Sequence, residues 1–190
     1  MNGYDKLEEK IGHSPHPAIV ALPLGAWMVS AVSDIMGLAT GQRAYDDTAR
    51  ISMGIGLVGA AGAVVTGLRD FGYIPKERPT HAIAIRHGTD MAIAASLLAT
   101  SFILRKRGHE VEGGPTLAAR LLALTGCGIS LYSAWLGGKL VEEYGEAVKP
   151  VIRQQQQAEQ SHKNARTQMT DAYLGEPREA ATLQRKGIPT

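Results

Sequence analysis

The stretch ISMGIGLVGAAGAVVTGL, residues 51–68, decides the fold of this chain. It carries no charged residue, and its glycines are Gly54, Gly56, Gly59, Gly62 and Gly67. In water, each glycine inside a helix costs about 1 kcal/mol relative to alanine. In a membrane, small residues let helices approach closely, and that close contact offsets the cost. We therefore interpret residues 51–68 as a tightly packed membrane-spanning helix.

Three further apolar segments flank this stretch, at residues 17–38, 81–104 and 117–140. A spanning helix needs about 20 largely apolar residues, and all four segments reach or approach that length. The connections, about 39–50, 69–80 and 105–116, are short and make neighbouring helices antiparallel. The sequence predicts an all-α fold, an integral membrane up-down-up-down four-helix bundle with a polar C-terminal tail. The alternative is a soluble four-helix protein with buried Ala- and Gly-rich helices.

The chain divides into a polar leader (1–15), a transmembrane domain (16–148) and a polar, Gln-rich tail (149–190). No basic stretch immediately precedes the first apolar segment, so it is not expected to be a cleavable signal peptide. The tail has neither Pro nor Gly between Val151 and Leu174, which predicts a helix over residues 150–174. Because this helix has few apolar anchors, we expect it to dock on another protein. Beyond Gly175 we expect an extended or disordered end.

Composition excludes several classes of function. The net charge of +2 over 190 residues lacks the clustered basic excess of a nucleic-acid binder. One cysteine, Cys127, excludes an internal disulfide framework and a multi-cysteine metal cage. No arrangement of nucleophile, base and acid has a supporting context, so the chain is not expected to be an enzyme. Its expected partners are the lipid bilayer and a protein that binds residues 150–190.

Four spans place both termini and the connection 69–80 on the same side of the membrane. Lys and Arg are slightly more numerous there, and the positive-inside rule then favours cytoplasmic termini. The compact cluster Arg105-Lys106-Arg107 on the other side argues the opposite orientation.

Polar residues meet on the terminal side of the predicted bundle. His16 opens the first helix, Asp70 closes the second and His81 opens the third. In a structural role, a neutral His16 donates to Asp70 or to an orphan carbonyl at a helix end. In a ligand role, His16 and His81 are axial ligands of a b-type haem, with Asp70 as the acceptor that orients an imidazole.

Deeper charges need partners inside the bundle. Asp34 lies about 27 Å from His16 at helical rise, near the opposite face, where Arg50 or Arg120 can pair with it. Arg86 and Asp90 have the i,i+4 spacing of an intrahelical ion pair. Alternatively, the third helix begins at about Gly88, and Arg86 is then an interfacial, snorkelling side chain.

Several of these motifs together resemble one family. They are HPAIVALPLG at 16–25, Asp34, GLRD at 67–70, His81-Ala82 and GGKLVEEYGEAV at 137–148. In this order they resemble the bacterial family of predicted four-helix membrane proteins catalogued as domain of unknown function twenty-two thirty-one. The resemblance covers residues 16–148 and implies a multi-pass protein of the bacterial inner membrane. Some relatives carry a Rieske-type iron–sulfur domain, so the resemblance implies an association with redox proteins. Ile85 departs from the family, which has an Asn-like residue there.

Two functions follow. One is a structural or anchoring subunit of a larger, redox or non-redox, membrane complex, with the tail binding a partner. The alternative is a membrane redox module that binds b-type haem or quinone through His16 and His81.

Overall fold

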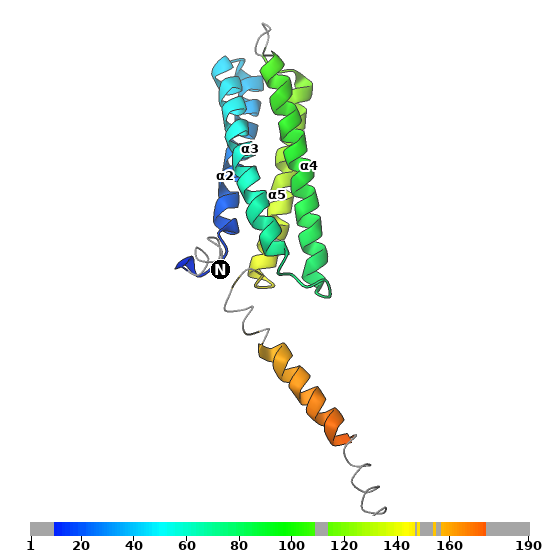
Figure 1. The fold of residues 1–190 in the computed structure, drawn as a ribbon. Helices are drawn as coiled ribbons and strands as arrows, with labels where there is room; N and C mark the ends of the chain where they lie inside the picture. Colours follow the sequence, from blue (N-terminus) through cyan, green and yellow to red (C-terminus); the bar gives the residue numbers. More distant parts are fainter. Residues whose placement is uncertain (1–9, 109–113, 147, 149–153, 155–156, 174–190) are drawn as a thin grey trace, which may run out of the picture. The chain divides into compact units, whose positions relative to one another are not determined.

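The computed structural model describes residues 10–108, 114–146, 148, 154 and 157–173. Its contacts divide the chain into two units, Met1–Val148 and Lys149–Thr190. The first unit contains α2 (His16–Thr40), α3 (Arg43–Phe71), α4 (Pro79–Gly108) and α5 (Leu117–Glu142), each running antiparallel to the next (Figure 1). The predicted all-α four-helix bundle is therefore confirmed.

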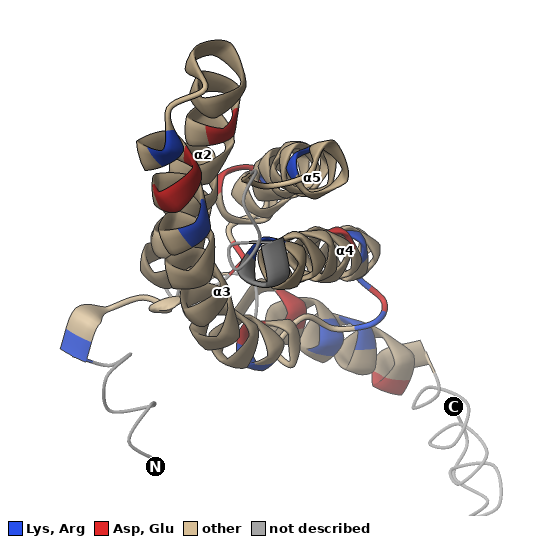
Figure 2. Cartoon of the chain, turned by 90° about the horizontal axis from the view of Figure 1, so that it is seen from above, with Lys and Arg blue, Asp and Glu red and all other residues tan. Residues whose placement is uncertain are grey.

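The bundle is built from two helical hairpins. The main helix contacts join α2 to α3 and α4 to α5, and smaller contacts join α3 to α4 and α2 to α5. Within the described helices, α2 has no comparable contact with α4, nor α3 with α5. Seen end-on, α2 and α4 accordingly stand at opposite corners of the bundle (Figure 2).

Local chemistry sets the helix ends. Gly41 ends α2 in the left-handed conformation (φ 66°), and its N–H donates to the Gly37 carbonyl at 2.9 Å. Thr116 caps α5, because its side chain accepts a hydrogen bond from the Ala119 N–H at 3.2 Å.

Two sequence-based boundaries are wrong. Arg105, expected in a loop, lies in the last turns of α4, which runs to Gly108. Helix α4 begins at Pro79, so the alternative start at about Gly88 is also wrong. In the sequence, the charged residues Arg86 and Arg105 suggest helix ends. In the structure, both lie inside α4.

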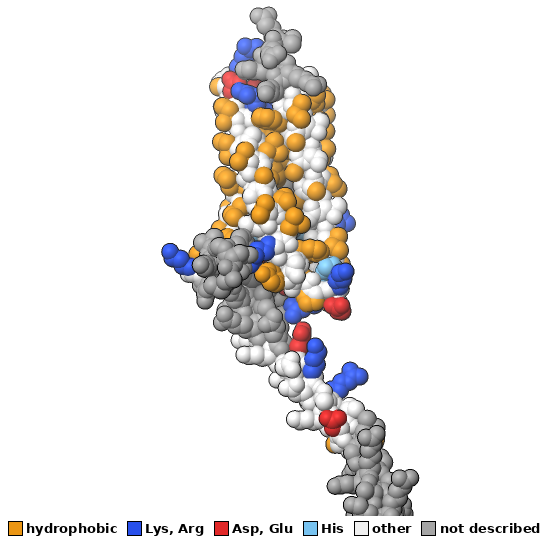
Figure 3. All heavy atoms as spheres, in the orientation of Figure 1, with side chains coloured by type: hydrophobic (Ala, Val, Ile, Leu, Met, Phe, Trp, Pro, Cys, Tyr) orange, Lys and Arg blue, Asp and Glu red, His pale blue; other side chains and the backbone are white. Residues whose placement is uncertain are grey.

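All four helices are long and apolar enough to cross a membrane, over His16–Thr40, Arg43–Phe71, Pro79–Arg105 and Leu117–Glu142. Large apolar side chains point outward along them, as at Val58 (76% exposed) and Val65 (68% exposed). Figure 3 shows apolar side chains covering the visible face of the bundle, with charged side chains gathered near its ends. An apolar surface of this kind suits lipid and is unfavourable in water.

The centre of the bundle takes one side chain from each helix, namely Trp27, Met53, Leu98 and Ala123. Gly56 lies directly against the Trp27 indole, where an added Cβ would overlap the ring. The glycines of residues 51–68 thus permit the close helix contact that their density predicts.

The two hairpins are internal repeats of each other, a feature that the sequence analysis missed. Aligning His16 with His87 pairs, at constant spacing, buried residues of α2 with buried residues of α4: Pro23 with Ala94, Trp27 with Leu98, Ser30 with Ser101, and Asp34 with Arg105. A constant spacing likewise aligns α3 with α5: Ala49 with Ala119, Arg50 with Arg120, Gly56 with Gly126, and Gly67 with Gly137. The bundle therefore has an approximate internal two-fold symmetry.

The second unit contains a tail helix, which covers residues 157–173. Residue 154 is also helical, and every described residue of this unit is exposed. The helix predicted for residues 150–174 is confirmed for these residues. The remainder of that prediction, and the extended end expected beyond Gly175, lie outside the described residues.

We predict that Gly56→Ala destabilises the bundle by about 1–3 kcal/mol, because its methyl group overlaps Trp27. Gly25→Ala is the matched control, since a Cβ there meets nothing within 4 Å. Thermal unfolding of the detergent-solubilised variants measures both. Equal melting temperatures would contradict this account of the packing.

The topology predicts that positions 11 and 73 lie on one side of the membrane and position 42 on the other. In a Cys127→Ser background, Ile11→Cys and Tyr73→Cys should react with an impermeant thiol reagent from the same side. Gln42→Cys should react only from the opposite side. Labelling of positions 42 and 73 from one side would overturn the four-span topology.

Candidate functional site

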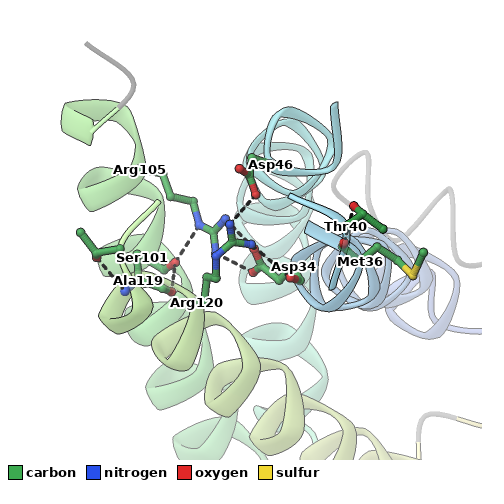
Figure 4. A network of polar contacts seen from close by, with 9 residues as sticks. Asp34, Met36, Thr40, Asp46, Ser101, Arg105, Ala119 and Arg120 are labelled. Atoms are coloured by element: carbon green, nitrogen blue, oxygen red, sulfur yellow. Dashed lines mark hydrogen bonds and ion pairs between the residues drawn. The ribbon is translucent and has the colours of Figure 1, made fainter. Parts of the chain in front are cut away.

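A buried ion pair occupies the end of the bundle where α2 and α4 finish (Figure 4). The Asp34 side chain is 0% exposed and the Arg105 side chain 2% exposed. Arg105 donates from Nη1 to Asp34 Oδ1 at 2.7 Å and from Nη2 to Oδ2 at 2.5 Å. This bidentate geometry is the strongest that an arginine and a carboxylate form.

The Arg105 guanidinium is oriented by a second set of bonds. Its Nε donates to Ser101 Oγ at 3.1 Å, and Ser101 Oγ donates to the Ala119 carbonyl at 2.6 Å. Helices α4 and α5 together therefore fix the direction in which Arg105 reaches Asp34.

Arg120 extends the pair into a network. Its Nη1 donates to the Asp34 carbonyl at 3.1 Å, and its Nη2 lies 2.7 Å from Asp46 Oδ1. A Cβ at Gly37 would lie 2.7 Å from Asp46 Oδ1, so the network fits only against bare backbone there. Asp34, Asp46, Arg105 and Arg120 come from α2, α3, α4 and α5 in turn. We call these four residues the ionic clamp.

The structure brings Arg120 to Asp34, one of the two partners that the sequence analysis offered. The principal partner, Arg105, was not predicted, because the sequence places that residue in a loop. One signal in the sequence points to it: Asp34 follows His16 by the same spacing as Arg105 follows His87.

The opposite end of the bundle holds the first predicted site residues. Ser14 Oγ donates to Asp70 Oδ2 at 2.6 Å and accepts from the His16 backbone N–H at 3.1 Å. Asp70 and the start of α2 are therefore joined through Ser14. The His16 imidazole itself turns to Thr66, with its Nδ1 2.9 Å from Thr66 Oγ1.

His81 has local partners. Its Nδ1 lies 3.1 Å from the Ile74 carbonyl, and its ring packs on Phe71 with centroids 4.8 Å apart. These contacts hold the connection between α3 and α4. The contacts of His16 and His81 thus lead to different partners.

A third imidazole, that of His87 on α4, lies in a tightly defined place. His87 Nδ1 is 2.7 Å from the Ser133 carbonyl and 3.0 Å from Ser133 Oγ. A Cβ at Gly137 would lie 3.0 Å from His87 Cε1. His87 therefore fits closely against α5.

Two other charged groups complete this end. Arg86 Nε lies 2.7 Å from Asp90 Oδ2, the i,i+4 pair that the spacing predicts, with the Arg86 side chain 65% exposed. The buried Glu146 accepts from Thr80 Oγ1 at 2.8 Å and pairs with Arg78 at 3.4 Å. These contacts stabilise helix ends; the Glu146 contacts were not expected from the sequence.

A comparison with protein families matches residues 12–150 to the family described as Predicted membrane protein (DUF2231). The chain belongs to this family. It is therefore a multi-pass membrane protein with four candidate spans, as the sequence motifs predict. No curated protein matches this DUF2231 protein. No solved structure matches it either.

Among the described residues, no three His, Cys, Asp or Glu side chains group closely enough to form a metal site. Cys127, the one cysteine of the chain, is buried in α5.

We predict that Asp34→Ala destabilises the DUF2231 bundle by about 3–5 kcal/mol, because it leaves Arg105 buried without its carboxylate. Lys139→Ala is the control, with an expected loss of less than about 1 kcal/mol, because its i,i+4 pair with Glu143 is partly exposed. Thermal unfolding in detergent measures both. The double variant Asp34→Arg/Arg105→Asp should recover part of the loss, since the two positions are equivalent in the repeat. An Asp34→Ala variant as stable as the parent would disprove the clamp.

Proposed function

We propose that this DUF2231 protein is a non-enzymatic structural or anchoring subunit of a larger membrane complex, whose tail binds a protein partner. The observation that carries the proposal is the tail helix, in which every described residue is exposed. Met169 is 74% and Tyr173 is 88% exposed. A helix that buries nothing of its own unit gains stability by docking elsewhere.

The sequence of the tail helix supports a helical partner. Small or apolar residues recur along one stripe of it, at Ala158, Ala165, Met169, Ala172 and Tyr173. Spacings of three and four residues place side chains on one helix face. Polar and charged residues fill the other positions. This pattern suits docking against a second amphipathic helix.

The ionic clamp supports the anchoring role. Its four charged side chains are satisfied by one another within the bundle, and the outward faces of the helices are apolar. A bundle built in this way holds its position in lipid independently of a partner. We further propose the bacterial inner membrane as its location and cytoplasmic termini, on the distribution of Lys and Arg.

A redox module is the second candidate. The ligands predicted from the sequence for such a module are His16 and His81, which would bind b-type haem or form part of a quinone site. One observation favours it: the imidazole of His16 is held through Nδ1 by Thr66, as imidazoles that bind a cofactor through the other nitrogen are.

Photo-crosslinking tests the anchoring role. A benzophenone amino acid replaces Met169, on the apolar stripe, or Thr167, away from it, in cells of the native organism. We expect Met169 to form one major adduct with a single protein species, and Thr167 to form much less of it. A variant lacking residues 154–173 should keep the melting temperature of the bundle. Equal or absent adducts at both positions would overturn the proposal.

A further inference from the structure

His16 and His87 are equivalent residues of the two hairpins, and both belong to the inward stripes of their helices. The stripe of α2 continues through the buried residues Pro23, Trp27, Ser30 and Asp34. The stripe of α4 continues through Ala94, Leu98, Ser101 and Arg105, which are also buried. Because α2 and α4 stand at opposite corners, their inward stripes turn toward the bundle axis from opposite sides (Figure 2). His16 and His87 lie within electrostatic range of each other.

The hydrogen bonds of His87 define its tautomer. Its Nδ1 lies 2.7 Å from the Ser133 carbonyl oxygen, which can only accept a hydrogen bond. The Ser133 hydroxyl donates its own proton to the His87 carbonyl at 2.8 Å. His87 Nδ1 therefore carries a proton. In the neutral imidazole, Nε2 then carries the available lone pair.

The hydrogen bonds of His16 define the same tautomer. Thr66 Oγ1 donates its proton to a backbone carbonyl, with those of Gly62 and Ala63 each at 3.2 Å. Thr66 Oγ1 must then accept from His16 Nδ1–H at 2.9 Å. Both imidazoles are thus held by the same nitrogen, and both present Nε2 as a Lewis base. Hydrogen bonding of one ring nitrogen to a protein acceptor is the usual support of a metal-binding histidine.

Each imidazole ring packs against a glycine of the neighbouring helix, and the two glycines are equivalent. A Cβ at Gly67 would lie 2.8 Å from His16 Cε1, and one at Gly137 would lie 3.0 Å from His87 Cε1. Gly67 and Gly137 are themselves partners in the repeat. Each hairpin therefore provides the same three parts, an imidazole, an acceptor for its Nδ1–H and a glycine without which the ring would have to move.

Two imidazoles held in this way, on opposite sides of the bundle axis, select a particular kind of ligand. A bare zinc or iron ion usually takes three or four protein ligands, and among the described residues no third metal-ligating side chain joins this pair. A porphyrin supplies four equatorial nitrogens to its iron and leaves two axial positions for imidazoles. The chain has a single cysteine, which excludes the two-cysteine attachment of a c-type haem.

We propose that His16 and His87 are the two axial ligands of one b-type haem, bound between the hairpins at the end of the bundle opposite the ionic clamp. Thr66 and the Ser133 carbonyl orient the two rings, and Gly67 and Gly137 keep the backbone close to them. The described parts of α2 and α4 share no close helix contact, so the macrocycle enters between helices that do not already interlock. When bound, the haem supplies one-electron transfer near one membrane surface. This site is independent of the anchoring role proposed above, because it uses no residue of the tail.

Absorption spectroscopy of the full-length protein, purified in detergent and titrated with hemin to saturation, tests the site. We expect one haem per chain and a low-spin, six-coordinate spectrum whose α and β bands sharpen on reduction with dithionite. His16→Ala and His87→Ala should each abolish the six-coordinate spectrum. His81→Ala, six residues before His87 on the same helix, distinguishes the two ligand assignments: it should leave the spectrum unchanged, because His87 and not the His81 of the second candidate function is the second ligand.

Further variants keep the test independent of folding. Thr66→Val retains both imidazoles and should weaken haem binding about 10- to 100-fold, as loss of an orienting bond does. His87→Gly should regain a six-coordinate spectrum when free imidazole is added. His87→Met should retain haem with a raised midpoint potential. Thermal unfolding establishes that each variant is folded.

Three results would overturn the proposal. The first is a folded parent protein that binds no haem at saturating hemin. The second is a haem spectrum that survives both His16→Ala and His87→Ala, and the third is a haem spectrum that disappears in His81→Ala. Deletion of residues 154–173 separates the two proposals, since it removes the crosslinked partner and should leave the haem spectrum intact.

Discussion

The buried pair between Asp34 and Arg105 is the interaction on which the arrangement of the two hairpins depends. It joins equivalent positions of an internal repeat across the bundle axis, where two identical charges would repel each other in a medium of low dielectric constant. One carboxylate and one guanidinium at these positions attract each other instead. Arg120 and Asp46 then bring the remaining two helices to the same point. Because an unpaired charge within a membrane is costly, any sliding of one hairpin along the other is unfavourable.

A fixed clamp has consequences at the far end of the bundle. His16 and Asp34 are separated by about 27 Å of helix, and the same length separates His87 from Arg105. Pairing of Asp34 with Arg105 therefore also sets His16 and His87 at matching depths. Between the two levels, the central contact of Trp27 with Gly56 keeps α2 and α3 close. The polar chemistry of the bundle is thus divided between its two ends, with the clamp supplying register and the imidazoles remaining available.

Long apolar runs predicted the four helices, because length and the near absence of charge are sufficient for a membrane span. Helix ends were predicted less well, because an arginine in sequence looks the same whether it meets water or a buried carboxylate. Arg105 was misplaced for that reason. His81 and His87 were equally hard to separate, since both stand in the first half of α4. Only the repeat distinguishes them, because His87 has an equivalent in His16 whereas His81 contacts its own connection. The repeat itself is hidden, since it survives in only a few widely spaced positions.

Which positions survive is informative. In the centre of the bundle, equivalent positions of the two hairpins carry side chains of different volume: Trp27 corresponds to Leu98, and Met53 to Ala123. The central packing therefore does not require the same residue in both hairpins. The imidazole and the glycine beneath it have not been exchanged in either half. An imidazole in a membrane span is harder to accommodate than a leucine, and a helical glycine is less stable than an alanine. The matching geometry of His16 on Gly67 and of His87 on Gly137 is the reason for proposing one ligand shared by the two hairpins.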